Sequence, residues 1–293
     1  MKTLVSALAL AFVLASAVRA DETYELKLKY VPKVGDKTNH TNKEKMNMKM
    51  TVSSGGAVVQ EQDQKERKSF EFTEEVVKVA DEDVSEGKWT FKEASHRVEG
   101  EDTDFGFKGK TVLGKKGEEG WEFTYEDGSE LEEDDLAGVK DALSKKKEKK
   151  EGQPEIQDVL EPGKPVKVGD SWDLDPKKFA AGMMDDEESF DLEKSSGTMK
   201  LISVEKRGGA QYGKLEGEIE LVAEKMGPVT LNKPIKLKFK LELDVCIDAS
   251  QPSGTIKIDA GMKGKRTAEA NGQEFELDID MDMGGTMTVE RAK

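Results

Sequence analysis

Cysteine and histidine are scarce in this sequence. The 293 residues include one cysteine, Cys246, and two histidines, His40 and His96. A single cysteine cannot form a disulfide within the chain, so the fold must depend on strand pairing and core packing. The chain has no nucleophile elbow, phosphate-binding loop or zinc-ligand spacing. We therefore predict that the protein is not an enzyme and uses no catalytic residue, metal or cofactor; the alternative is a cleft that holds His40 or His96 beside an acid.

Positive charge is also in deficit. Lys and Arg number 46 against 61 Asp and Glu, a net charge of −15. Binding to a nucleic acid backbone needs a basic surface, so nucleic acid is excluded as an expected partner. Charged residues make up 37% and hydrophobic residues 35% of the chain. This balance would favour disorder if the two kinds were scattered, but they alternate in register over long runs, which indicates an ordered chain.

Long hydrophobic runs are missing except at the N-terminus. The stretch from Leu4 to Ala17 is nearly uninterrupted, follows the basic Lys2 and precedes small residues at the usual cleavage positions. It predicts a secretory signal peptide over residues 1–20 rather than a membrane span. We therefore expect an exported protein, periplasmic or extracellular, that does not span a membrane after removal of the leader.

Strand patterning dominates the rest of the chain. Apolar and polar residues alternate in runs that each predict a strand with one dry face. The runs cover 24–30, 46–52, 235–247, 256–260 and 275–283, with glycine-containing turns expected at 55–56, 208–209, 252–254, 271–272 and 284–285. The predicted fold is mainly β, a long antiparallel meander that forms a curved sheet, a half-barrel or two packed β-units.

Two segments depart from this pattern. Residues 131–149 begin with acids, end with lysines and carry an apolar stripe of Leu136, Val139 and Leu143, which predicts an amphipathic helix. A short helix is predicted over 176–184, with Pro176 at the favoured first position. The predicted organisation is a signal peptide (1–20), an N-terminal β-unit that ends in the helix (21–150), a proline-rich linker (151–167) and a C-terminal antiparallel β-unit (168–293).

A four-residue phrase occurs twice. It reads Lys-Val-Gly-Asp at 33–36 and at 167–170, which indicates either two related β-units or a shared local turn. The longer segment from Pro162 to Trp172 resembles one found in exported bacterial β-rich protein families of unknown function, whose members begin with a signal peptide and a Tyr-x-Leu-x-Leu strand such as residues 24–28. The resemblance implies export and a strand-rich fold and assigns no functional residue. The layout is more loosely similar to periplasmic half-barrel carriers of lipids and lipoproteins.

Methionine provides the candidate binding site. Methionines alternate along two predicted strands, so their thioethers share apolar faces. Such residues serve core packing, line a site for a lipid or other apolar ligand, or bind Cu(I) through sulfur. Ligand lining is the functional hypothesis, with an apolar cavity expected between the sheet and the 131–149 helix. The candidate ligand-binding residues are Met46, Met48, Met50, Phe239, Met281 and Met283.

The acids also form a pattern. Glu276, Asp278, Asp280 and Asp282 share one predicted strand face, but the glycine and glutamate of a calcium loop are out of position. We interpret the row as a solvated face that complements lysines 236, 238 and 240 from a strand two places away.

Two functional hypotheses follow. The first is an exported, non-enzymatic protein that binds an apolar or lipid-like ligand in the cell envelope. The second is a structural or interaction protein of the envelope or extracellular matrix that acts through its acidic surface, with an envelope component as its partner and a filled core.

Overall fold

The computed structural model describes residues 22–118, 120–143, 154–183, 189–226, 229–270 and 273–292. The predicted signal peptide, the turn expected at 271–272 and the end of the first predicted helix at 144–149 lie outside these residues. The first half of the chain forms β1 (Thr23–Tyr24), β2 (Lys37–Ser54), β3 (Ala57–Ala80), β4 (Asp83–Val98), β5 (Glu101–Asp104), β6 (Thr111–Gly117), β7 (Gly120–Tyr125) and α1 (Glu133–Ala142). The second half forms α2 (Ile156–Leu160), β8 (Val166–Lys167), β9 (Ser171–Asp173), α3 (Pro176–Met183), β10 (Phe190–Arg207), β11 (Ala210–Met226), β12 (Val229–Cys246), β13 (Gly254–Ala270) and β14 (Gln273–Arg291).

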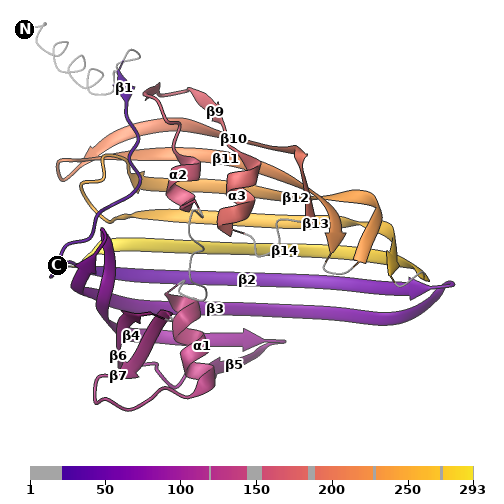
Figure 1. Cartoon of the computed structure of the whole chain (residues 1–293), viewed down its shortest axis with the longest axis horizontal. Coiled ribbons are helices and arrows are strands. Elements are labelled where there is room, and N and C mark those ends of the chain that lie inside the picture. Colours follow the sequence, from indigo (N-terminus) through magenta and orange to yellow (C-terminus); the bar gives the residue numbers. More distant parts are fainter. Residues whose placement is uncertain are drawn as a thin grey trace, which may run out of the picture.

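One continuous sheet organises the protein (Figure 1). Its 12 strands follow the order β7-β6-β4-β3-β2-β14-β13-β12-β11-β10-β9, with β5 paired to β4 beside this path. Consecutive long strands are antiparallel neighbours, as in a meander. The prediction of a mainly β, long antiparallel meander is therefore confirmed.

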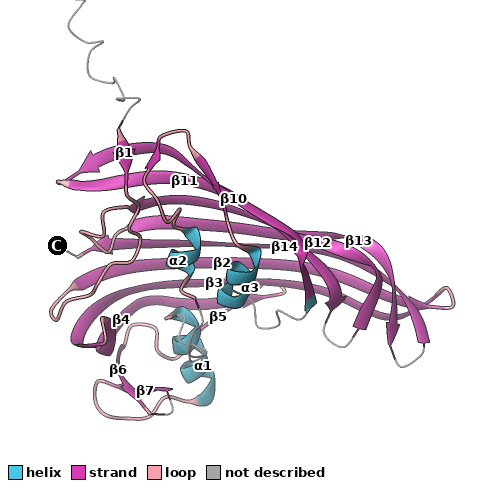
Figure 2. Ribbon diagram, turned by 45° about the horizontal axis from the view of Figure 1, so that its top comes forward, coloured by secondary structure: helices cyan, strands magenta, loops and turns pink. Residues whose placement is uncertain are grey.

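β2 and β14, the first and last long strands, pair with each other and join the two halves of the chain in one sheet. β14 pairs with β2 from Glu276 opposite Ser53 to Arg291 opposite Thr38. This pairing runs along nearly the whole length of both strands. Of the arrangements that the sequence left open, the structure therefore has the single curved sheet rather than two packed units (Figure 2).

The helices of the described chain lie against one face of the sheet (Figures 1 and 2). At the end of α1, the carbonyl of Ala142 accepts a 2.9 Å hydrogen bond from Nδ2 of Asn42 on β2. In α3, the Phe179 ring packs edge-on against Phe239 of β12, with 5.1 Å between centroids. We call this side the helix face and the opposite side the outer face. Within the described residues, no helix combines the length and the apolar composition needed to cross a membrane.

Two separate cores lie beneath the helices. The C-terminal core, under α2 and α3, gathers apolar side chains of β10 to β14 such as Leu221 and Ile279. The N-terminal core, under α1, is aromatic and includes Phe70, Trp89 and Phe91, each 1% exposed. Both predicted helices are therefore used to cover apolar strand faces, as their stripes require.

Aromatic rings fill the space between α1 and the sheet. A Cβ added at Gly138 of α1 would lie 2.8 Å from atoms of both Phe105 and Phe107. Val139, the next residue, is fully buried. Under the described part of the predicted helix, the expectation of an apolar cavity is therefore wrong, because aromatic side chains of the N-terminal half occupy that space.

The N-terminal segment differs from its prediction as a strand over 24–30. Tyr24 and Leu26 are buried and Glu25 between them is exposed, as the alternation requires. However, only β1 is a strand here, and it pairs with β8, while Lys27 makes a single bridge to Asp248. An alternating pattern shows only that every second side chain is buried. In this segment Tyr24 and Leu26 pack into the C-terminal core, although the segment is not a strand of the long sheet.

The segment 151–167, predicted as a linker because of its prolines, contains secondary structure. It includes α2 and β8, and Val159 and Leu160 of α2 are buried in the C-terminal core. Indole Nε1 of Trp172 donates a 3.1 Å hydrogen bond to the carbonyl of Leu160. The second predicted helix is confirmed as α3, and the first is present as α1 over its described part.

Glycine pairs serve two purposes. Gly55 and Gly56 have φ of +57° and +82° and form the turn between β2 and β3, as predicted. Gly284 and Gly285 were also predicted as a turn, but they lie within β14, opposite Lys45 and Glu44. That prediction is wrong because these two glycines continue the strand without side chains and do not reverse the chain direction.

The repeated phrase forms the same local turn in both copies. The backbone N–H of Lys33 donates to the Asp36 carboxylate at 2.7 Å, and that of Lys167 donates to Asp170 at 2.8 Å. In each copy the aspartate N–H also donates to the lysine carbonyl, at 2.9 and 3.0 Å. The side chain and backbone of the aspartate therefore close one tight loop twice.

Each of these turns docks on a long strand in the same way. The N–H of Gly35 donates to the carbonyl of Val76 at 2.9 Å, and that of Gly169 donates to the carbonyl of Leu201 at 2.7 Å. The N–H of the same strand residue donates back to the carbonyl of the turn aspartate. Gly35 and Gly169 have φ of +87° and +95°, the region that favours glycine. The phrase is thus a repeated docking turn.

Lys68 of β3 ties α1 to the sheet. Its Nζ lies 2.6 Å from Oδ2 of Asp141 in α1 and 3.1 Å from Oε1 of Glu66 on its own strand. The same Glu66 oxygen lies 3.0 Å from Nε2 of His96 on β4. Burial favours a lower pKa for Lys68, but the two carboxylates outweigh it and raise that pKa. Burial favours a higher pKa for Glu66, but Lys68 and His96 outweigh it and lower that pKa.

Alanine at the second docking turn should destabilise the fold. We expect Gly169→Ala to lower the free energy of unfolding by about 1–2 kcal/mol, because a side chain is strained at positive φ. Denaturant titration measures the change. Gly261→Ala is the control, since a Cβ there meets only the Met281 carbonyl oxygen at 3.5 Å; it should leave stability unchanged or raise it by up to about 1 kcal/mol. Equal losses in both variants would contradict the strained-turn explanation.

Replacing Glu66 should change how stability depends on pH. The folded-state pKa of Glu66 lies below its ordinary value of 4.5. Its ionised form therefore stabilises the fold above pH 4.5, and this contribution disappears as the pH falls below that value. We expect Glu66→Gln to cost about 1 kcal/mol at neutral pH and progressively less in acid. Denaturant titrations across this range test it, with the exposed outer-face Glu61→Gln as control; a deficit that does not vary with pH would refute the charge-based explanation.

Candidate functional site

Five of the six predicted ligand-binding residues lie together on the helix face. β2 and β14 place Met46 opposite Met283 and Met48 opposite Met281. On β13, Met262 lies opposite Met281 and adds a methionine that was not predicted. Because residues two apart on a strand share a face, these thioethers form one continuous surface. We call it the methionine strip, which consists of Met46, Met48, Met50, Met262, Met281 and Met283.

The methionine strip lies between the two cores. Met50, Met281 and Met283 are partly buried and pack against the C-terminal core. Met46 and Met48 are partly buried as well, but among the described residues they belong to neither core. A strip of flexible thioethers that keeps part of its apolar area exposed is suited to contact a guest of variable shape.

Phe239 is separated from the other predicted residues. It lies opposite Ala260 of β13, which in turn lies opposite Met283. The Phe239 side chain is 5% exposed and is covered by Phe179 of α3. Phe239 therefore belongs to the packed C-terminal core rather than to the exposed part of the strip.

A polar edge borders the strip on β3. Gln62 and Gln64 lie opposite Met50 and Met48, and Glu66 lies opposite Met46. Nε2 of Gln62 donates to Oε1 of Gln64 at 3.1 Å, and the Gln64 amide reaches Glu66 at 3.5 Å. On the helix face, β2 therefore presents thioethers, whereas the adjacent strand β3 presents amides and a carboxylate. This change provides polar partners for one end of an amphipathic molecule.

Sequence signals existed for the residues that the prediction missed. Met262 shares the parity of Ile256, Ile258 and Ala260 on the same strand. The glutamines recur at every second position from 60 to 64, the spacing of one strand face. Their position beside the methionines depends on the pairing of β2 with β3, which alternation alone does not specify.

The histidines are accounted for by packing and local ion pairs. His40 stacks on Phe72, with 4.6 Å between centroids, and its Nε2 lies 3.3 Å from Glu74. His96 contacts Glu66 and stacks on Phe105. Both lie beside an acid, as the enzymatic alternative required, but one flat face of each ring is covered by a phenylalanine.

The remaining candidate chemistries have simple structural explanations. Cys246 is a free cysteine, 4% exposed, that packs with Ala210 and Tyr212. Within the described residues, no group of three or more His, Cys, Asp or Glu side chains is arranged to hold a metal ion.

The acid row of β14 is paired with neighbouring strands. Asp278 lies 3.1 Å from Lys265 and Asp280 lies 2.5 Å from Lys263, both on β13. The prediction that this row complements lysines 236, 238 and 240 is wrong, since Lys236 instead pairs with Glu220 of β11 at 2.6 Å. Adjacent antiparallel strands bring opposite charges closer than strands two places apart.

Comparisons with known proteins give only distant structural likenesses. The chain matches no protein-family model and no curated protein. A structure described as lipid–protein interactions in lipovitellin shares 6% identity and a TM-score of 0.36, covering 89% of this chain and 26% of that one. This chain therefore spans about a quarter of the lipovitellin chain.

Two bacterial structures are also similar in part. An outer membrane channel from Pseudomonas putida has 7% identity and a TM-score of 0.18, with coverage of 91% of this chain and 98% of that one. A DUF1329 family protein from Desulfovibrio piger has 10% identity and a TM-score of 0.13, with 85% of each chain covered. These TM-scores are too low to transfer any function to this chain.

Proposed function

We propose that this protein is an exported, non-enzymatic binding protein for an apolar or lipid-like ligand in the cell envelope. The observation that supports the proposal is the methionine strip, in which Met46 and Met48 keep exposed apolar area between two packed cores. Export is supported by the leader predicted at residues 1–20.

The strip has properties that favour an apolar guest. Burial of apolar surface supplies about 25 cal/mol per Å², so covering partly exposed methionines favours association. Thioether side chains rotate freely and adapt to irregular shapes. The guest lies on the helix face, with its apolar part on the methionines and its polar end toward Gln64 and Glu66.

The acidic-surface hypothesis has less support. Many outer-face acids are already engaged by lysines of adjacent strands, as at Asp278, Asp280 and Glu220. Paired charges on neighbouring strands reduce the field that a cationic partner would meet.

A bound guest should be detectable directly. We expect native mass spectrometry of the protein, exported with its own leader, to show a stoichiometric added mass that denaturation releases as a lipid or other apolar molecule. If the purified protein shows only its own mass, it is incubated with a naphthylamine probe whose fluorescence rises in apolar surroundings. No added mass and no probe binding would refute the proposed function.

Substitution of the strip should separate binding from stability. We expect Met46→Gln/Met48→Gln to weaken probe binding by about tenfold. The free energy of unfolding should fall by no more than about 1.5 kcal/mol, because both side chains are already partly exposed. Fluorescence titration and denaturant unfolding measure the two effects. Met287→Gln is the matched control, on the same face of β14 and 38% exposed, and should keep full probe binding. A large loss of stability with unchanged binding would instead identify the two methionines as core residues.

A further inference from the structure

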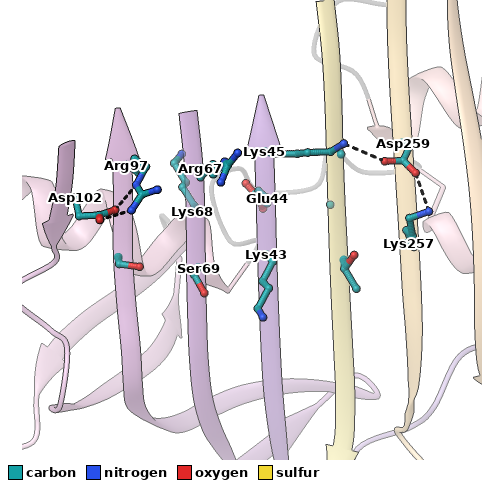
Figure 3. Close-up of a pocket in the computed structure, with 14 residues that line it drawn as sticks. Lys43, Glu44, Lys45, Arg67, Lys68, Ser69, Arg97, Asp102, Lys257 and Asp259 are labelled. Atoms are coloured by element: carbon teal, nitrogen blue, oxygen red, sulfur yellow. Dashed lines mark hydrogen bonds and ion pairs between the residues drawn. The ribbon is translucent and has the colours of Figure 1, made fainter. Parts of the chain in front are cut away.

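A hollow on the outer face gathers positive charge in this acidic protein. It has a volume of about 480 Å³ and lies where β13, β14, β2, β3 and β4 run side by side (Figure 3). Five Lys or Arg residues and two acids of the outer face line it, although the whole chain has an excess of 15 acids. The lining also includes Lys68 and Glu44, which hold alternate strand positions and belong to the helix face. The hollow is on the opposite face of the sheet from the methionine strip, since Lys45 and Met46 are consecutive residues of β2.

Three cations lie in one row across neighbouring strands. Lys45 of β2 is directly opposite Arg67 of β3, and Arg67 is directly opposite Arg97 of β4. Lys43 lies two residues from Lys45 on the same face. Like charges in directly opposite positions destabilise a sheet, whereas unlike charges stabilise it. This row therefore carries an electrostatic cost that an anion would remove.

Some of these cations already form an ion pair with a carboxylate, and others do not. Arg97 is held by Asp102 of β5, with Nε donating at 2.5 Å. Lys45 reaches Asp282 of β14 at 3.5 Å and Asp259 of β13 at 3.7 Å. Lys257 reaches Asp259 at 3.0 Å. Figure 3 shows the pairs with Asp102 and Asp259 at the two ends of the hollow.

Arg67 and Lys43 lie between these pairs. Among the described residues, neither has a carboxylate within ion-pair distance. Elsewhere on the same face, lysines such as Lys236 and Lys263 each have an acid on the adjacent strand. Within the part of the chain that the structure describes, no carboxylate therefore neutralises Arg67 or Lys43 at the centre of the hollow.

A glycine in the floor of the hollow makes room for a charged side chain. A Cβ at Gly284 would lie 2.6 Å from Cε of Lys45 and 2.7 Å from Oδ1 of Asp259. Glycine at this position allows the Lys45 side chain to cross β14. The next row across the strands carries hydroxyls, with Ser69 opposite Ser95. A guanidinium, an ammonium and hydroxyl donors are groups that bind a tetrahedral oxyanion.

We propose that this hollow binds a phosphate-type oxyanion, held by Arg67 and Lys43 with Ser69 and Ser95 as hydroxyl donors. The phosphate is either a dissolved ion or the headgroup of a lipid, because both present the same oxygen atoms. The guanidinium fork of Arg67 engages two oxygens, and the ammonium of Lys43 neutralises charge from the neighbouring strand.

The test is phosphate binding at constant ionic strength, with chloride replacing phosphate in the reference buffer because salt screens exposed charges. We expect inorganic phosphate to raise the thermal unfolding midpoint of the full chain and to give a saturable calorimetric signal. Arg67→Gln/Lys43→Gln should weaken phosphate binding by about tenfold or more. Without phosphate the same variant should unfold at an equal or higher temperature, because the repulsion across the row is reduced. This combination separates loss of the site from loss of the fold.

Lys236→Gln/Lys263→Gln is the matched control. It removes the same amount of positive charge from the same face, outside the hollow. Salt screens charges at that distance from the site, so the phosphate affinity of this variant should stay within about twofold of wild type. Phosphatidylcholine vesicles with and without phosphatidic acid form the second arm. Binding of inorganic phosphate that only the Arg67/Lys43 variant loses supports a dissolved ion. Binding only to vesicles with phosphatidic acid, lost in the same variant, supports a lipid headgroup.

Two results would overturn the proposal. One is that neither inorganic phosphate nor phosphatidic acid binds the wild-type chain. The other is an equal loss of binding in the Arg67/Lys43 variant and in the Lys236/Lys263 control, which would indicate a general charge effect. Met46→Gln/Met48→Gln, on the opposite face, should bind phosphate like wild type, so the outcome here is independent of the outcome for the methionine strip.

Discussion

The antiparallel pairing of β14 with β2 is the interaction on which the rest of the structure depends. It joins strands from opposite ends of the chain and converts two sets of strands into one sheet. Without it, β2 and β14 would each be an exposed edge, and long unpaired edges promote association with other chains. The pairing also brings Met46 beside Met283 and Lys45 beside Gly284. Both candidate binding surfaces are therefore built across the same junction, one on each face.

Strand periodicity explains how one junction carries two different surfaces. Consecutive residues such as Lys45 and Met46 point to opposite faces, so the methionines and the cations are interleaved along β2. A slip of one residue in the register would move lysines under the helices and thioethers to the outer face. The cost of burying a charge and exposing apolar surface makes that slip unfavourable. The contrast between the two faces thus helps to fix the register that creates both sites.

The sequence predicted those features that depend on local pattern. Alternation identified parts of β2, β12, β13 and β14, and the apolar stripe around Val139 and the Pro176 start identified α1 and α3. Alternation did not single out β3, β4, β10 or β11. It could not show that the alternation of Tyr24 and Leu26 serves the C-terminal core instead of the long sheet, because burial looks the same in both cases. The cationic row was also missed. Lys45, Arg67 and Arg97 are far apart in the sequence and become neighbours only through strand register.

The separation of the two cores explains why the junction is the place for a guest. Aromatic rings fill the space under α1, and Phe179 closes the C-terminal core over Phe239. An internal cavity large enough for a ligand would cost stability in proportion to its volume, and the rings under α1 remove the space in which it was expected. Among the described residues, Met46 and Met48 lie between these cores and are members of neither, and both are partly exposed, so a guest can bury more of their apolar area. A guest on the strip would also contact Met281, which packs on the C-terminal core, and approach Glu66, which is linked to α1 through Lys68. Binding there would therefore connect the two cores across the β2–β14 junction and would stabilise the folded state as any selective ligand does.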